Sequence, residues 1–136
     1  MIRMELGISN GLVGMVHERL AEHRNYAAII NYLGEGGIRR QLETNMKWVM
    51  GLYEGPLCIA AMWGNHEIHL VTREGYENKW INPKLFRQFW RWFFANNDKA
   101  VVTPDNGLVI PFLLRVGFRW EDQKLVMEPQ DLRLPI

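Results

Sequence analysis

The sequence predicts an α/β protein built on a mixed sheet, with an antiparallel meander, then a parallel strand–helix–strand unit, and helices on both faces. Two observations lead to this prediction. The first is a pair of apolar, strand-like runs, 47–53 and 57–63, separated by a Glu-Gly-Pro turn. The second is a helix-length apolar run over 83–96 that lies between shorter strand-like runs, 66–72 and 100–103. A helical crossover between successive strands makes those two strands parallel neighbours.

The elements before the meander are a strand and a set of helices. Apolar and polar residues alternate over 1–8, the pattern of a half-buried strand. Ser9 is a suitable N-cap for the helix predicted by apolar spacing over 12–20. Residues 26–33 form a second helical run, and a short polar helix resumes at 38–45. Three glycines break the run between them: Gly34, Gly36 and Gly37. Because a helix precedes these glycines, we interpret them as a break or loop and not as a phosphate cradle.

The segment after the long helix has two interpretations. Residues 101–110 would pass as a hairpin turning at Pro104-Asp105-Asn106-Gly107. Apolar residues, however, continue without alternation to Val116, and Pro111 would not sit in a central strand. We therefore prefer a strand, a turn and a helix over 105–116 that ends at Gly117. A last hairpin is predicted over 119–128, and the tail from Pro129 shows no periodicity.

The size and charge of the chain narrow the class of protein. Its 136 residues suit one domain spanning 1–136, and the formal net charge of +1 argues neither for nor against a nucleic-acid partner. The single cysteine, Cys58, excludes an internal disulfide framework and suits a reducing compartment. No apolar run approaches the roughly 20 residues that span a bilayer. We expect a cytoplasmic protein with no membrane partner.

One polar pair on a predicted strand is a candidate for catalysis. Glu67 and His69 are two residues apart, so both side chains lie on one face of the strand. They are candidates for removing a proton or contacting a substrate, the alternative being a hydrogen-bonded structural pair. His66 points to the opposite face, and His17 and His23 are six apart on a helix, so we predict no metal site.

The order of elements resembles the GNAT acyltransferase fold over nearly the whole chain. Asn106, Val109, Leu113 and the Gly117-Phe118 pair resemble that family's fifth strand and fourth helix. The segment Glu74-Gly75-Tyr76, followed by a polar loop and a helix, resembles its approach to the pyrophosphate loop. The resemblance implies transfer of an acetyl or other acyl group from a coenzyme A thioester to an amine on a small molecule or a protein.

The resemblance also implies where acetyl-CoA would bind. It would enter between the fourth and fifth strands, and backbone amides of the loop at 77–82 would hold its pyrophosphate at the N-terminus of the long helix. The residues implied to bind the cofactor are Val71, Glu77, Asn78, Lys79, Trp80, Asn82, Lys84 and Asn106.

The cofactor loop departs from the family pattern. The family has Gln or Arg, two residues, Gly, one residue, and Gly or Ala, whereas this chain has Glu77, Trp80 and Asn82 at those positions. Glycine lets a phosphate approach the backbone closely, and Pro83 lacks an amide hydrogen. Leu113 stands where many members have a Tyr that protonates the leaving thiolate. The loop and the active site are therefore degenerate relative to the family.

A second hypothesis keeps the fold as a catalytically silent scaffold. The short chain also resembles GNAT-like proteins of tailed phages, which implies a structural or assembly role among virion proteins, in the host cytoplasm or the virion. Exposed tryptophans would then anchor the interface; the candidates are Trp48, Trp80, Trp92 and Trp120. Nucleic acid is the least favoured partner, and its contacts would be Lys79, Lys84, Arg87 and Arg91.

Overall fold

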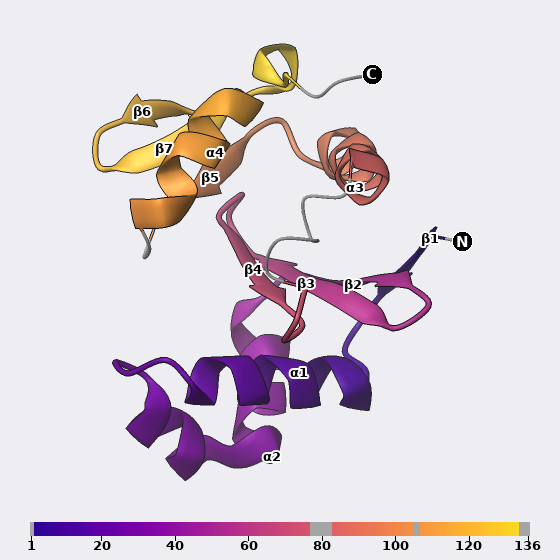
Figure 1. The fold of residues 1–136 in the computed structure, drawn as a ribbon, viewed down its shortest axis with the longest axis vertical. Helices are drawn as coiled ribbons and strands as arrows, with labels where there is room; N and C mark the ends of the chain where they lie inside the picture. The colour runs from indigo at the N-terminus through magenta and orange to yellow at the C-terminus, as the bar shows by residue number, and fades with distance from the viewer. Residues whose placement is uncertain (1, 77–82, 105–106, 134–136) are drawn as a thin grey trace.

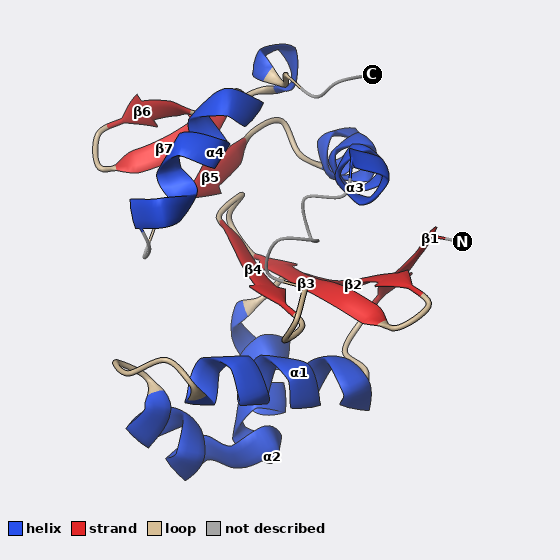
Figure 2. Ribbon diagram, viewed as in Figure 1, coloured by secondary structure: helices blue, strands red, loops and turns tan. Residues whose placement is uncertain are grey.

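The computed structural model describes residues 2–76, 83–104 and 107–133, and for Leu108 the backbone alone. Apart from α2, which runs through two predicted helical segments, its helices and strands follow one another as the sequence predicts (Figures 1 and 2). In chain order they are β1 (Ile2–Leu6), α1 (Asn10–Ala21), α2 (Ala27–Asn45), β2 (Trp48–Glu54), β3 (Leu57–Trp63), β4 (Ile68–Thr72), α3 (Pro83–Asn96), β5 (Ala100–Val102), the 3-10 turn η1 (Gly107–Val109), α4 (Ile110–Val116), β6 (Arg119–Glu121), β7 (Lys124–Met127) and the 3-10 turn η2 (Pro129–Asp131).

The strands form two sheets that meet at one point. The first has the order β1-β2-β3-β4 and is antiparallel throughout. The second has the order β5-β7-β6 and is also antiparallel. The sheets are joined by a parallel bridge between Glu67 and Val101, so β4 and β5 are parallel neighbours as predicted.

The first sheet is buried on both faces, which gives the protein two apolar cores. Along β3, Ile59 and Trp63 face a core shared with α3, α4, β5 and β7, whereas Ala60 and Met62 face a core shared with α1 and α2. This alternation follows from the two-residue period of a strand. Figure 1 shows α1 and α2 on one side of the sheet and α3 on the other, which confirms helices on both faces.

Helix α3 provides most of the aromatic core. Its buried face carries Leu85, Phe89 and Phe93, and the ring of Phe93 lies 5.2 Å from that of the fully buried Trp63. The opposite face of α3 is charged. Of the helices in the described segments, none is long and apolar enough to cross a bilayer.

The helical hairpin on the other face corrects one prediction. The hydroxyl of Ser9 caps α1 by accepting a hydrogen bond from the Leu12 N–H at 3.1 Å, as predicted. The predicted glycine loop in α2 is wrong in its extent. Only Gly34 leaves helical geometry, with φ 65° and ψ −178°, whereas Gly36 and Gly37 continue the helix. The break is therefore a one-residue kink, at a conformation that side chains other than glycine strongly disfavour.

The segment after β5 is helical and is not a hairpin. Backbone 107–109 makes a 3-10 turn that leads into α4, and Pro111 lies in the first turn of that helix, where its missing N–H costs nothing. Residues 105 and 106 lie outside the described part of the chain. Gly117 ends α4 with φ 130°, and a Cβ there would lie 2.0 Å from the carbonyl oxygen of Asp131.

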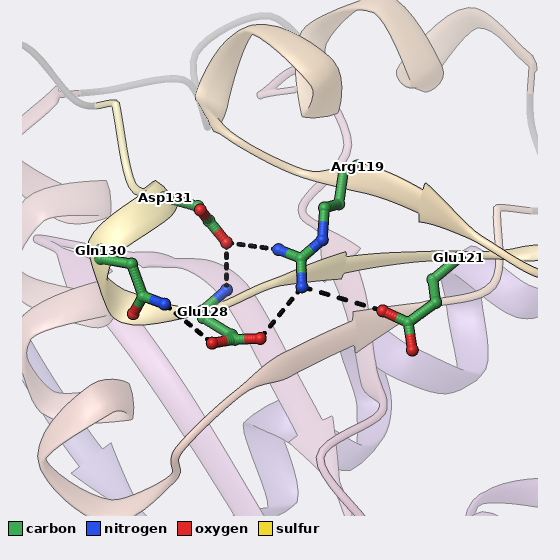
Figure 3. Close-up of polar contacts among 5 residues, drawn as sticks. All are labelled: Arg119, Glu121, Glu128, Gln130 and Asp131. Carbon is green, nitrogen blue, oxygen red and sulfur yellow. Dashed lines mark hydrogen bonds and ion pairs between the residues drawn. The ribbon is translucent and has the colours of Figure 1, made fainter.

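The C-terminal segment has a structure that its lack of periodicity did not reveal. In η2, Glu128 and Asp131 cap each other's backbone, and the Arg133 N–H donates to the Val116 carbonyl at 2.6 Å. Figure 3 shows the guanidinium of Arg119 between the carboxylates of Glu121, Glu128 and Asp131. The hydrogen bond to Glu128 is the main cause that raises the pKa of Arg119 above its ordinary value. Charge pairing thus fastens the C-terminal segment to the β6–β7 hairpin.

Candidate functional site

The candidate site begins where β4 and β5 separate. The Val101 N–H donates to the carbonyl of His66 at 3.0 Å, and the parallel bridge follows at Glu67. His66 has φ 68°, a left-handed conformation that turns the chain into β4 at this point. Past the bridge, the described strands pair elsewhere, β4 with β3 and β5 with β7. Two parallel strands therefore open away from each other toward their C-terminal ends.

The edge of β4 that faces this opening carries backbone hydrogen-bonding groups. In the β3–β4 ladder the Arg73 N–H donates to the Cys58 carbonyl at 2.9 Å. Because an antiparallel ladder alternates bonded and non-bonded pairs, Val71 also directs its backbone groups toward β3. The N–H and C=O groups of Leu70 and Thr72 consequently point away from β3, into the opening.

Glu67 connects the two sheets at the point where the strands part. Its Oε1 accepts a hydrogen bond from the Thr103 hydroxyl at 2.6 Å, and its Oε2 lies 3.3 Å from the Lys124 ammonium. The hydrogen bond from Thr103 is the main cause that lowers the pKa of Glu67, and Lys124 lowers it further against the opposing effect of burial. Glu67 is therefore a carboxylate at neutral pH, and a weaker proton acceptor than an ordinary glutamate.

The structure brings Glu67 and His69 to one side of β4, as their spacing predicts. Both line an open cavity of about 420 Å³. The rest of its lining comes from the end of α2 and the turns beside it: Thr44, Asn45, Met46, Lys47, Gly64 and Asn65. His69 is exposed, so its imidazole can reach a bound molecule, whereas His66 lies 3.5 Å from Asp98.

Six of the eight residues implied to bind the cofactor lie outside the described residues: Glu77, Asn78, Lys79, Trp80, Asn82 and Asn106. Their role stays a prediction. Of the other two, Val71 packs its side chain against the α1–α2 core. Lys84 is exposed in the first turn of α3 and lines a groove with Ile2 and Met4 of β1.

The described residues leave more room for the narrow arm of a cofactor along the outer edge of β4 than between β4 and α3. Between Leu70 and the aromatic face of α3 the structure leaves a hollow of about 10 Å³, which is room for about one water molecule. A ligand would therefore lie along the backbone of Leu70 and Thr72, outside the core. Leu113, at the position where the sequence resemblance implies a tyrosine in many relatives, is buried and offers no proton.

Sequence reasoning missed Thr103 and Lys124. Thr103 follows β5, and Lys124 opens β7 opposite Glu121. They reach Glu67 only because β5 bridges β4 at Val101 and pairs with β7 through Val102 and Leu125. No local pattern encodes these registers, although the polar Thr103 next to an apolar strand was an available signal.

Comparisons with known proteins agree on the architecture. No family model matches the sequence, and no curated protein matches it. Among solved structures, a chimera of the spermidine N-acetyltransferase SpeG from Vibrio cholerae and hSSAT superposes with a TM-score of 0.68 at 11% identity, covering 93% of this chain and 96% of that one. The PaiA N-acetyltransferase from Thermoplasma acidophilum, in complex with coenzyme A, gives 0.60 at 13% identity over 93% and 99% of the two chains. A GCN5-related N-acetyltransferase from Rhodopseudomonas palustris gives 0.65 at 10% identity over 93% and 94%.

The chain has the GNAT fold. In GNAT terms, the opening between β4 and β5 is the place that the sequence resemblance assigns to the cofactor, and Glu67 and His69 lie beside it. Identities of 10 to 13% establish the architecture alone, so the activity has to be argued from the site.

Proposed function

We propose that this GNAT-fold protein is an N-acyltransferase that moves an acetyl group from coenzyme A to a primary amine. One observation supports it above the others: β4 leaves β5 after a single bridge and turns the peptide groups of Leu70 and Thr72 into the opening. The pantetheine arm of coenzyme A carries two amides, and residues two apart on a strand present their peptide groups at a spacing of about 6.6 Å. An arm of this kind can pair with the strand edge as another strand would.

The residues beside the opening suit different tasks in amine acylation. The thioester of acetyl-CoA supplies the activated acyl group. Glu67 is held as an anion by Thr103 and Lys124, which occupy both of its oxygens, so we assign it a structural task and not proton removal. His69 is exposed and lines the same cavity as Glu67. Histidine is the side chain used most often for proton transfer near neutral pH, so we assign proton removal to His69.

The decisive experiment is residue-resolved hydrogen exchange with and without acetyl-CoA. In the free protein we expect the Leu70 and Thr72 amides, which point away from β3, to exchange faster than the Val71 amide, which is bonded to β3. Saturating acetyl-CoA is expected to slow exchange at Leu70 or Thr72 and to leave Val71 unchanged, which makes Val71 an internal control. If 1 mM acetyl-CoA left the exchange rate of each of the three amides unchanged, the proposed cofactor site would be rejected.

A turnover assay separates binding from catalysis. Free thiol release from acetyl-CoA is measured with spermidine as the first amine, because one structural neighbour is a spermidine N-acetyltransferase chimera. His69→Gln is expected to lower kcat about 100-fold, the usual contribution of a general base, while acetyl-CoA affinity stays the same. His23→Gln is the matched control, because His23 is exposed beyond the end of α1. Cofactor binding without turnover of any amine would instead favour a catalytically silent scaffold.

A further inference from the structure

A second surface lies at the other edge of the four-stranded sheet, between β1 and α3. It is an open groove of about 620 Å³. Its lining residues are Ile2 and Met4 of β1 and Lys84, Arg87, Gln88, Arg91, Trp92 and Ala95 of α3. Since β1 and β4 are the two outer strands of the sheet, this β1–α3 groove is separate from the opening between β4 and β5 (Figure 1).

The charge of the groove has one sign. Lys84, Arg87 and Arg91 recur at three- and four-residue spacing, so they share the face of α3 turned away from its buried aromatic face. None of the described lining residues is acidic. Within the described structure, the Nε of Arg87 is shielded from solvent and has no hydrogen-bond partner. Three cations with no acidic residue among the described lining favour an anionic ligand.

The wall of the groove opposite α3 is a strand edge. The Gly7 N–H donates to the Val49 carbonyl at 2.7 Å, which sets the phase of the β1–β2 ladder. By alternation Arg3 and Glu5 bond to β2, whereas Met4 turns its N–H and C=O outward. Among the described strands, β1 pairs with β2 alone. An unpaired edge of this kind accepts an added strand.

We propose that the β1–α3 groove binds an extended acidic peptide segment of another protein. The segment adds as a strand to the outer edge of β1 and places acidic side chains against Arg87 and Arg91. A row of alternating N–H and C=O groups matches a polypeptide backbone, which a nucleic acid does not offer. The apolar surface of Ile2, Met4 and Trp92 accepts the aliphatic parts of such a segment.

Three synthetic peptides test the proposal on the unchanged protein by fluorescence anisotropy. The first is a labelled nine-residue peptide that alternates Glu and Val, the second carries Gln in place of Glu, and the third is the Glu peptide with every backbone nitrogen methylated. The Glu peptide is expected to bind at least tenfold more tightly than either of the others. Equal binding of the Gln peptide would overturn the role of charge, and equal binding of the methylated peptide would overturn strand addition.

Variants locate the binding site. Arg91→Glu and Arg87→Glu are each expected to weaken binding of the Glu peptide at least tenfold. Arg115 is an exposed cation on α4, outside the groove, so Arg115→Glu should change the affinity less than twofold. The amide signal of Met4 in an NMR titration is expected to shift with the Glu peptide. Equal weakening by Arg115→Glu would show a general charge effect and refute the groove. If an arginine variant fails to fold, the three-peptide comparison still decides.

Two other occupants are outcomes that would overturn the proposal. Tighter binding of a single-stranded oligothymidylate than of the Glu peptide would assign the groove to nucleic acid. A dimer in sedimentation that Arg91→Glu dissociates would assign it to a second copy of this chain. None of these measurements uses acetyl-CoA, so failure here leaves the proposed acyl transfer untouched.

Discussion

Glu67 is the residue whose removal tests the described site most directly. It touches three segments at once, because it precedes β4, accepts from Thr103 after β5 and pairs with Lys124 at the start of β7. Replacing it with Ala removes both interactions, whereas Gln keeps an oxygen for Thr103 and removes only the charge. Glu67→Ala and Glu67→Gln therefore separate the hydrogen bond from the ion pair.

The expected magnitudes follow from exposure. The side chains of Glu67 and Lys124 are 30% and 50% exposed, so solvent screens their attraction and the pair contributes about 0.2 to 1 kcal/mol. The hydrogen bond from Thr103 adds about 0.5 to 1.5 kcal/mol. Glu67→Ala should thus lower the free energy of unfolding by about 1 to 2 kcal/mol, and Glu67→Gln by less than about 1 kcal/mol.

The pH dependence gives an independent check through the lowered pKa of Glu67. A carboxyl group whose pKa is lower in the folded protein stabilises it above the unfolded pKa, about 4.3, and loses that stabilisation as pH falls through the folded value. Urea unfolding from pH 7 to pH 3 should therefore show a constant difference between wild type and Glu67→Gln above about pH 5.5 that vanishes at lower pH. Glu43→Gln, at an exposed position on α2, is the control. A difference that grows as pH falls would refute the network drawn around Glu67.

Three further predictions concern stability and are read from urea unfolding midpoints. Gly34→Ala should lower the free energy of unfolding by about 1 to 3 kcal/mol, because Gly34 has a left-handed φ. Gly36 lies in the helix with open space around it, so Gly36→Ala should raise the free energy of unfolding by up to about 1 kcal/mol. Equal effects of the two substitutions would contradict the single-residue kink. Gly117→Ala should cost about 3 kcal/mol or more, since its Cβ would meet the Asp131 carbonyl at 2.0 Å, and a neutral result would contradict the docking of η2. Phe93→Ala, at a fully buried ring, should cost about 3 to 5 kcal/mol, and a loss under 1 kcal/mol would contradict the aromatic core.

The sequence predicts well those elements whose signals are local. The turn at residues 54–56 joins β2 to β3 as its composition indicates, and Gly55 has the positive φ that the turn needs. The apolar stripe of α3 marks the face that the structure buries. Pro111 correctly indicates a helix and not a hairpin, because proline fits the first turn of α4 but not a central strand.

Glycine composition alone did not fix the shape of α2. Gly34, Gly36 and Gly37 look alike in sequence, yet one of them leaves the helix and two remain in it. Each glycine inside a helix destabilises it by about 1 kcal/mol relative to alanine, and burial of neighbouring apolar side chains can offset this loss. Here Ile38 and Leu42, on the next two turns, are buried against α1 and the sheet, and that burial holds the second half of α2 in place.

The polar network could not be predicted, because it depends on registers between distant strands. Lys124 lies 57 residues from Glu67 along the chain, and Thr103 lies 36 residues away. Their meeting requires the bridge at Val101 and the pairing of β5 with β7. Alternation within β4 predicted only that Glu67 and His69 share a side.

The contacts of Glu67 with Thr103 and Lys124 determine which of the two candidate residues is the better proton acceptor. The sequence pattern makes Glu67 and His69 equivalent candidates for accepting a proton. Thr103 and Lys124 lower the pKa of Glu67 and occupy both of its oxygens, so the bonds that fasten the two sheets together also weaken this carboxylate as a base. His69 is exposed and opens onto the same cavity as Glu67. If the protein acylates amines, the structural task of Glu67 therefore shifts proton removal to His69, and the activity should be more sensitive to His69→Gln than to Glu67→Gln.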